Sequence, residues 1–179
     1  MSGNVAPLVE VRDLKKYFPA HEGIVIQRTV AEVKAVDGVT VRVHEGHTVG
    51  VVGESGSGKT TLAMGLLRLQ SSMGEIRFRG EALHDMGWKE LRPLRREMQI
   101  VFQDPFGSMS PRMSVFQVIE EGLLVHGLGD SYDARRALVA EVLGEVGLDP
   151  DTMDRYPHEF SGGQRQRICV ARALVLRPK

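Results

Sequence analysis

One short segment limits the fold of this chain more than any other. It reads Gly53-Glu54-Ser55-Gly56-Ser57-Gly58-Lys59-Thr60 and matches the pattern G-x-x-x-x-G-K-[ST] at every fixed position. Residues 47–52 before it are apolar enough to predict a short buried strand, and residues 60–69 after it predict a helix. Because the pattern works only as strand, loop and helix in this order, we expect an α/β fold built around it.

The residue types of this segment favour binding of a nucleoside triphosphate. Its glycines let the chain curl so that backbone N–H groups point inward at a phosphate. Lys59 is expected to reach the β- and γ-phosphates, and the Thr60 hydroxyl is expected to ligate Mg²⁺. Thr61 then begins the wall of the helix behind them. A glycine-rich turn with a surface lysine is the alternative, and the strand–loop–helix frame argues against it.

A second helix start carries the same kind of chemistry. Ser161 suits an N-cap, and Gly162 and Gly163 allow backbone N–H groups to approach a ligand closely. Gln164 adds a side-chain amide, and the helix dipole favours negative charge at this end. Alone, the segment is equally consistent with an ordinary serine-capped helix. Together with the first loop, it predicts a second anion-binding element.

Composition narrows the class of protein further. The chain has 179 residues with 23 basic and 23 acidic side chains, so net charge gives no bulk attraction to nucleic acid. The single cysteine, Cys169, lies among apolar residues and is expected to be a buried structural thiol. Neither an apolar run long enough to span a membrane nor a secretion signal is visible, which predicts a soluble cytoplasmic domain.

Periodicity along the chain predicts the remaining elements. Strands are expected at 8–12, at 33–43 as a pair turning at Asp37-Gly38, at 74–80 exposed with Ile76 and Phe78 on one face, and buried at 99–102. Helices are expected near 88–98, at 115–125, at 133–147 and from Ser161 onward, with a loop at 104–111. These elements suggest a β-rich portion with the phosphate loop (1–103), a helical subdomain (104–160) and a final helix (161–179).

The order of three features resembles the nucleotide-binding domain of ABC transporters. The loop at Lys59 is followed by an apolar run ending in Gln103 and then by Ser161-Gly162-Gly163-Gln164. The resemblance implies a P-loop NTPase (RecA-like) core, an antiparallel β portion and a helical insertion, with ATP and Mg²⁺ as ligands. It implies that Gln103 contacts Mg²⁺ and the attacking water. It also implies that Phe18, or Tyr17 if the register slips, stacks on adenine.

Shorter motifs give a narrower resemblance. Residues 32–39, 53–59, 101–105 with 110–112, and 156–160 are similar to ATP-binding subunits of dipeptide and oligopeptide importers, of the F type or the second half of fused forms. Nickel and glutathione importers share this subfamily. The resemblance implies a head-to-tail partner domain, with ATP between the P-loop of one and the Ser161 helix of the other. It also implies membrane subunits contacted from Gln103 to Arg112, and a place on the inner face of the membrane.

The chain departs from the family pattern at its end. The family continues with an apolar strand ending in Asp-Glu, whose acids help to hold Mg²⁺ and activate water, and this sequence contains no Asp-Glu pair. We therefore expect an incomplete sheet with an open apolar edge, and a phosphate cradle without hydrolysis by the chain alone. Two alternatives stay open: a nucleotide-binding piece with a regulatory or structural role, and an ABC ATPase that does not serve transport.

Overall fold

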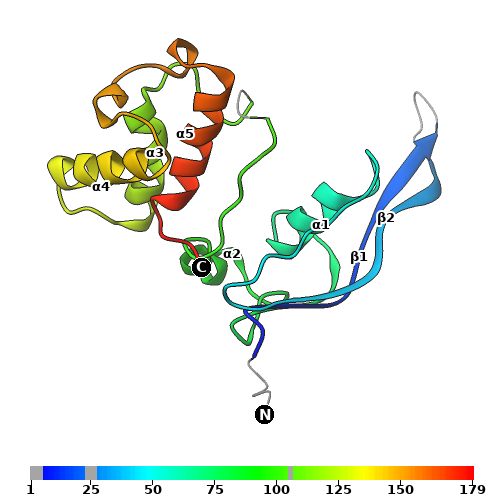
Figure 1. Ribbon diagram of the computed structural model, residues 1–179. Coiled ribbons are helices and arrows are strands. Elements are labelled where there is room, and N and C mark those ends of the chain that lie inside the picture. The colour runs from blue at the N-terminus through cyan, green and yellow to red at the C-terminus, as the bar shows by residue number, and fades with distance from the viewer. Residues whose placement is uncertain (1–5, 23–27, 105–106) are drawn as a thin grey trace. The chain divides into compact units, whose positions relative to one another are not determined.

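The structure, a computed structural model, describes residues 6–22, 28–104 and 107–179. The chain divides into two compact units, Met1–Leu91 and Arg92–Lys179, each with its own core (Figure 1). The domain boundaries expected from sequence, at 103 and 160, remain predictions. Among the described residues, no helix is both long and apolar enough to cross a membrane.

The N-terminal unit is built on an antiparallel sheet. Its strands are β1 (Val9–Glu22), β2 (Arg28–Val43), β3 (Met73–Phe78) and β4 (Glu81–Ala82), in the order β2-β1-β3-β4. Ile76 and Phe78 share one face of β3, as the sequence pattern predicts, but their side chains are buried although the strand was expected to be exposed. Helix α1 (Lys59–Leu66) packs on the same face, and its buried Gly65 lies beside the Leu14 side chain.

Residues 33–43 do not form the predicted pair of strands. They belong to the single strand β2, in which Val36 lies opposite Lys16 and Val39 lies opposite Leu14. Asp37 and Gly38 therefore form a bulge opposite one residue of β1, and the φ of +74° at Gly38 suits such a bulge. The Asp-Gly dipeptide predicts a hairpin turn locally, but pairing of β2 with β1 along its length outweighs this local preference. The turn between β1 and β2 lies outside the described residues.

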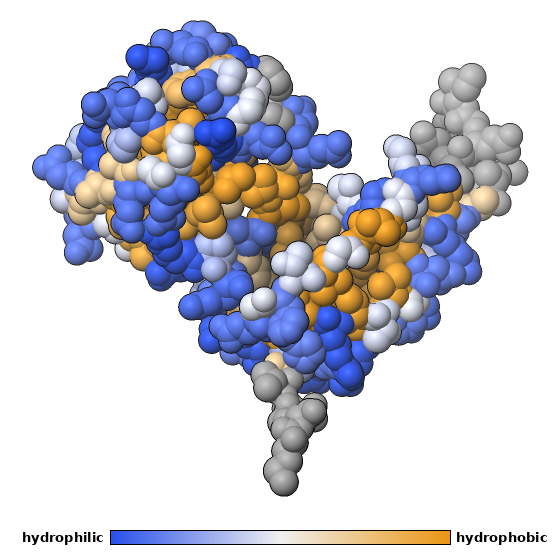
Figure 2. All heavy atoms as spheres, in the orientation of Figure 1, coloured by the Kyte–Doolittle hydropathy of each residue, from blue (hydrophilic) through white to orange (hydrophobic). Residues whose placement is uncertain are grey.

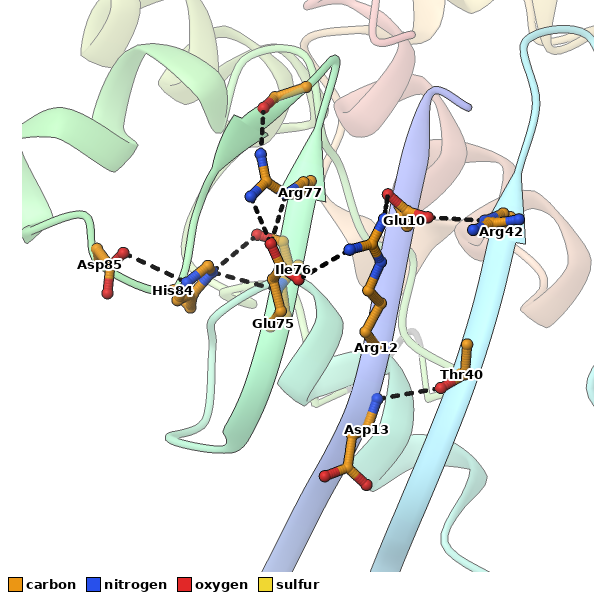
Figure 3. A network of polar contacts seen from close by, with 11 residues as sticks. Glu10, Arg12, Asp13, Thr40, Arg42, Glu75, Ile76, Arg77, His84 and Asp85 are labelled. Carbon is orange, nitrogen blue, oxygen red and sulfur yellow. Dashed lines mark hydrogen bonds and ion pairs between the residues drawn. The ribbon is translucent and has the colours of Figure 1, made fainter. Parts of the chain in front are cut away.

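Charged side chains join the three main strands across one face of the sheet (Figure 3). The Glu10 carboxylate on β1 accepts from Arg42 Nε on β2 at 2.7 Å and from Arg12 at 3.1 Å. Arg12 also donates to Glu75 on β3 at 3.4 Å. The bond from Arg42 is the main reason that the pKa of Glu10 lies below its usual range. Because these groups face solvent, the network contributes modestly to stability and mainly favours this register.

Two segments predicted to be buried strands are neither strands nor buried. Residues 47–52 and 99–102 pair with no other strand among the described residues, and the exposed fraction is 93% at Val52 and 41% at Phe102. A continuous apolar run becomes a buried strand only when neighbouring strands and covering helices are present on both sides. Among the described residues, no strand pairs with either run, so neither becomes part of a sheet. Figure 2 shows apolar surface on both units, including an area beside α1 and β2.

The described residues of the C-terminal unit pack around three α-helices. They are α3 (Val115–His126), α4 (Tyr132–Glu145) and α5 (Gly162–Leu174), and all three were predicted. Helix α2 (Trp88–Leu94) is shorter than predicted and contains Pro93, which cannot donate a helical hydrogen bond, and short 3-10 turns occur at Pro150–Thr152 and Pro157–Glu159. The core of this unit contains Met109, Val115, Phe116, Val118, Ile119, Leu123, Val139, Val142, Leu143, Leu148, Met153, Phe160, Ile168, Cys169, Ala171, Val175 and Leu176.

Candidate nucleotide-binding site

The glycine-rich loop closes on its own lysine. Lys59 Nζ donates to the carbonyl oxygens of Gly53 at 2.8 Å and Glu54 at 2.6 Å, and to Ser57 Oγ at 3.3 Å. The Ser57 N–H donates to the Glu54 carbonyl at 3.2 Å, which makes the turn that curls the loop. The result is a loop wrapped around a cationic group at the start of α1, which is the arrangement that binds phosphate.

Gly58 joins this loop to the sheet. Its φ is +92°, and a Cβ placed there would lie 2.1 Å from the carbonyl oxygen of Ala35 on β2. A side chain at position 58 is therefore excluded by both backbone conformation and contact. The contact is made where the pairing of β1 and β2 shifts register, between Lys16 opposite Val36 and Tyr17 opposite Lys34. The place of Ala35 beside the loop could not be predicted from sequence, because nothing in its local sequence signals the shift.

Two aromatic residues on β1 lie in different surroundings. The Tyr17 hydroxyl donates to Asp37, and Lys34 Nζ lies 5.3 Å from the Tyr17 ring centroid. The bond to Asp37 raises the pKa of the Tyr17 phenol and lowers the pKa of the carboxyl. Phe18 instead keeps 37% of its surface exposed. Since Tyr17 is engaged with Asp37, Phe18 is the better candidate to stack on a base.

An apolar hollow of about 870 Å³ lies beside the loop in the N-terminal unit. Its walls are side chains of β2, of residues 49–53 and of α1, with several valines from β2 and from residues 49–52 among them. Such walls offer few partners to a charged triphosphate, so the hollow is not the phosphate site. Phosphate binding belongs to the rim of the hollow, where Ser57, Gly58 and Lys59 also line it.

The start of α5 forms the predicted cap. Ser161 Oγ accepts from the Gln164 N–H at 3.4 Å, and Gln164 Oε1 accepts from the Ser161 N–H at 2.9 Å. A Cβ added at Gly162 or Gly163 would meet nothing within 4 Å. Packing inside the chain therefore does not require glycine at either position. A molecule approaching this helix start from outside could come close to the backbone there.

Gln103 is exposed and precedes a segment that is attached to α5. Arg172 on α5 donates to the Ser108 carbonyl, and Ser108 Oγ lies 3.4 Å from Cys169 Sγ. Cys169 itself is buried, as predicted. Phe18, Lys59 and Thr60 thus belong to the N-terminal unit, whereas Gln103 and the Ser161 group belong to the C-terminal unit. That Gln103 acts with Lys59 and Thr60, and that the Ser161 group serves the nucleotide of a partner domain, both stay predictions.

A glycine-rich loop holding a lysine at a helix start defines the class of P-loop nucleotide-binding proteins. Within that class the family is also determined. The model of the ABC transporter family matches residues 36–179, and the chain belongs to this family.

Individual relatives give the same family. The chain is 55% identical to the peptidoglycan transport ATP-binding protein YejF of Agrobacterium fabrum, over 93% of this chain and 30% of that protein. It is 50% identical to the putative oligopeptide transport ATP-binding protein YkfD of Bacillus subtilis, over 97% of this chain and 51% of that protein. The chain thus spans about a third to a half of the length of these curated relatives.

Solved structures confirm the predicted fold class. A dimeric structure of MJ0796, described as a bacterial ABC transporter cassette, superposes with a TM-score of 0.82 and 26% identity. The match covers 95% of this chain and 70% of that chain. The same cassette in a dimeric post-hydrolysis state with ADP and Pi gives a TM-score of 0.82 and 27% identity, with the same coverage. The antiparallel sheet, phosphate loop and helical unit of this chain are therefore those of an ABC cassette.

Proposed function

We propose that this chain is the nucleotide-binding part of a subunit that binds and hydrolyses ATP to drive import through an ABC transporter. The loop that wraps Lys59 at the start of α1 carries this proposal, because it holds a lysine ammonium inside a glycine-rich turn at a helix start, the kind of place where proteins bind phosphates. The names of the relatives, which refer to peptidoglycan, oligopeptide and glutathione transport, support peptides or related small solutes as cargo.

The described residues suit distinct roles around ATP. Residues 53–58 and Lys59 would hold the phosphates, and Phe18 would stack on the adenine. The hydroxyl of Thr60 and the amide oxygen of Gln103 fit Mg²⁺, which prefers oxygen ligands and takes few of them from the protein. Mg²⁺ would neutralise charge on the phosphates; the chain's own residues bind and orient them.

Two partners are part of the proposal. One is a second ATPase domain arranged head to tail, and the open backbone at Gly162 and Gly163 supports a role for this surface on the partner's nucleotide. The other is a membrane permease contacted through residues 103–112, which places the subunit at the inner face of the membrane. The contacts of Ser108 with Arg172 and Cys169 support this role, because they attach the segment to the helix that begins at Ser161.

We further propose that the 179 residues alone bind ATP without turnover. No Asp-Glu pair occurs anywhere in the sequence, so the acids that hold Mg²⁺ and activate water in this class have no counterpart here. Regulation by a bound but unhydrolysed nucleotide is the alternative role for such a chain.

Calorimetric titration of the chain with Mg-ATP tests these proposals. Lys59→Ala removes charge-assisted bonds worth about 1.5–3 kcal/mol, so affinity should fall roughly 10- to 150-fold. Lys89→Ala, at an exposed lysine on α2, is the matched control and should bind like the parent. Equal affinity in both variants would contradict nucleotide binding at this loop. Phosphate release that Lys59→Ala abolishes would contradict the absence of turnover.

A further inference from the structure

Phe18 is held from one side by a cation. Lys16 Nζ lies 5.0 Å from the centroid of the Phe18 ring, within the range of a cation–π contact. The two residues stand two apart on β1, a spacing that places side chains on the same face of a strand. The Lys16 ammonium also donates to Ser71 Oγ at 3.1 Å. Ser71 therefore fixes the lysine that covers the ring.

We propose that Lys16, anchored by Ser71, is a positioning residue for the base-stacking surface of Phe18. This inference rests on the proposed binding of ATP and deepens it. An unrestrained phenylalanine at the surface samples several rotamers, and a base stacks well on only some of them. An ammonium over one face draws the ring into one orientation. Base stacking is then left to the exposed part of Phe18, which amounts to 37% of its surface.

The position of Ser71 adds a second consequence. Ser71 lies on the connection between α1, which ends at Leu66, and β3, which begins at Met73. The Lys16–Ser71 bond thus ties the strand that carries Phe18 to the connection after the helix of the phosphate loop. A base on Phe18 and phosphates at Lys59 are then held by parts of one unit whose spacing this bond helps to fix.

The neighbouring lysine provides a matched control. Lys15 Nζ pairs with Asp13 at 2.7 Å, and this bond is the main cause of its raised pKa. It carries the same charge on the same strand, yet the contacts that define the proposal, to the Phe18 ring and to Ser71, belong to Lys16. A general effect of positive charge on nucleotide binding would appear at both lysines, whereas a positioning effect would appear at Lys16 alone.

The test compares two probes on the full chain, Mg-ATP and Mg-tripolyphosphate, by calorimetric titration. Lys16→Met keeps the apolar stem and removes the charge, so ATP affinity should fall about two- to fivefold while tripolyphosphate affinity stays unchanged. Ser71→Ala should act in the same direction. Lys16→Arg should retain parental affinity, because a guanidinium also makes a cation–π contact with an aromatic ring and has N–H donors for Ser71. Lys15→Met should leave both affinities as they are.

Three results would overturn the inference: unchanged ATP affinity in Lys16→Met, an equal loss for both probes, or failure of Lys16→Arg to retain affinity. If, in such a case, the parent chain still binds both probes and Lys59→Ala still weakens that binding, only the inference fails and the proposed function stands. If the parent binds neither probe, the proposed function fails and the inference fails with it. Circular dichroism melts of each variant show whether it is folded before titration.

Discussion

At the scale of single residues, we expect opposite effects from removing the two aromatic side chains of β1: one loss should weaken ATP binding, and the other should lower stability. Phe18→Ala should weaken binding of Mg-ATP by about 1–3 kcal/mol, the range for loss of one aromatic stacking partner. Tyr17→Ala should leave ATP affinity unchanged and instead lower the melting temperature, because it removes the bond to Asp37 and the contact with Lys34. Calorimetric titration and thermal melting of both variants separate the two effects. A larger affinity loss in Tyr17→Ala would assign stacking to Tyr17.

The same pair shows what sequence can predict at this scale. The motif around Lys59 identifies the phosphate loop because its chemistry depends on residue type and spacing alone. The choice between Phe18 and Tyr17 stayed open, since it depends on Asp37, which reaches Tyr17 from another strand. The close approach of Gly58 to the Ala35 carbonyl could not be predicted from sequence either, because it follows from a register shift between β1 and β2.

At the scale of elements, α5 separates stability from surface function. Ser161→Ala removes the cap, and the free energy of unfolding of the C-terminal unit should fall by about 0.5–2 kcal/mol. Gly163→Ala should not lower it, because alanine favours helix over glycine and the added Cβ meets nothing within 4 Å. Urea denaturation monitored by circular dichroism measures both changes.

Gly163→Ala nevertheless should reduce nucleotide-dependent association in sedimentation velocity with Mg-ATP, because its Cβ occupies the surface proposed to face the partner's nucleotide. Association equal to that of the parent chain would contradict that role for the helix start.

Elements were predicted well where their cause is local. Helices α3, α4 and α5 were predicted from apolar periodicity and, for α5, from the cap at Ser161; the structure adds serine caps at Ser114 and Ser131. Segments 47–52 and 99–102 were predicted wrongly as buried strands, because an apolar run specifies burial only if other strands arrive beside it. The bulge at Asp37-Gly38 was read as a hairpin for a related reason, since only pairing with β1 distinguishes the two.

At the scale of the whole molecule, the exposed apolar segments predict association of the chain, and the two separate cores predict unfolding in more than one step. The exposed fraction is 93% at Val52 and 43% at Val101, so the chain should associate as its concentration rises. Val52→Lys should reduce this association in sedimentation velocity, whereas Ala137→Lys, at an exposed position of α4, should not.

Thermal unfolding should show more than one transition because each unit has its own core. A monomer with a single sharp transition would contradict both expectations.

The reciprocal cap of α5 also determines when the helix start becomes ordered, which is during folding and before a partner binds. Ser161 and Gln164 satisfy each other's backbone N–H groups within the folded unit, so the helix start is rigid before any partner arrives. The conformational entropy of ordering this segment is lost during folding and is not lost again on association. Preorganisation of this kind strengthens binding without adding a contact. A second cassette would then meet a finished surface, and closure around ATP would depend on how the domains approach rather than on local rearrangement.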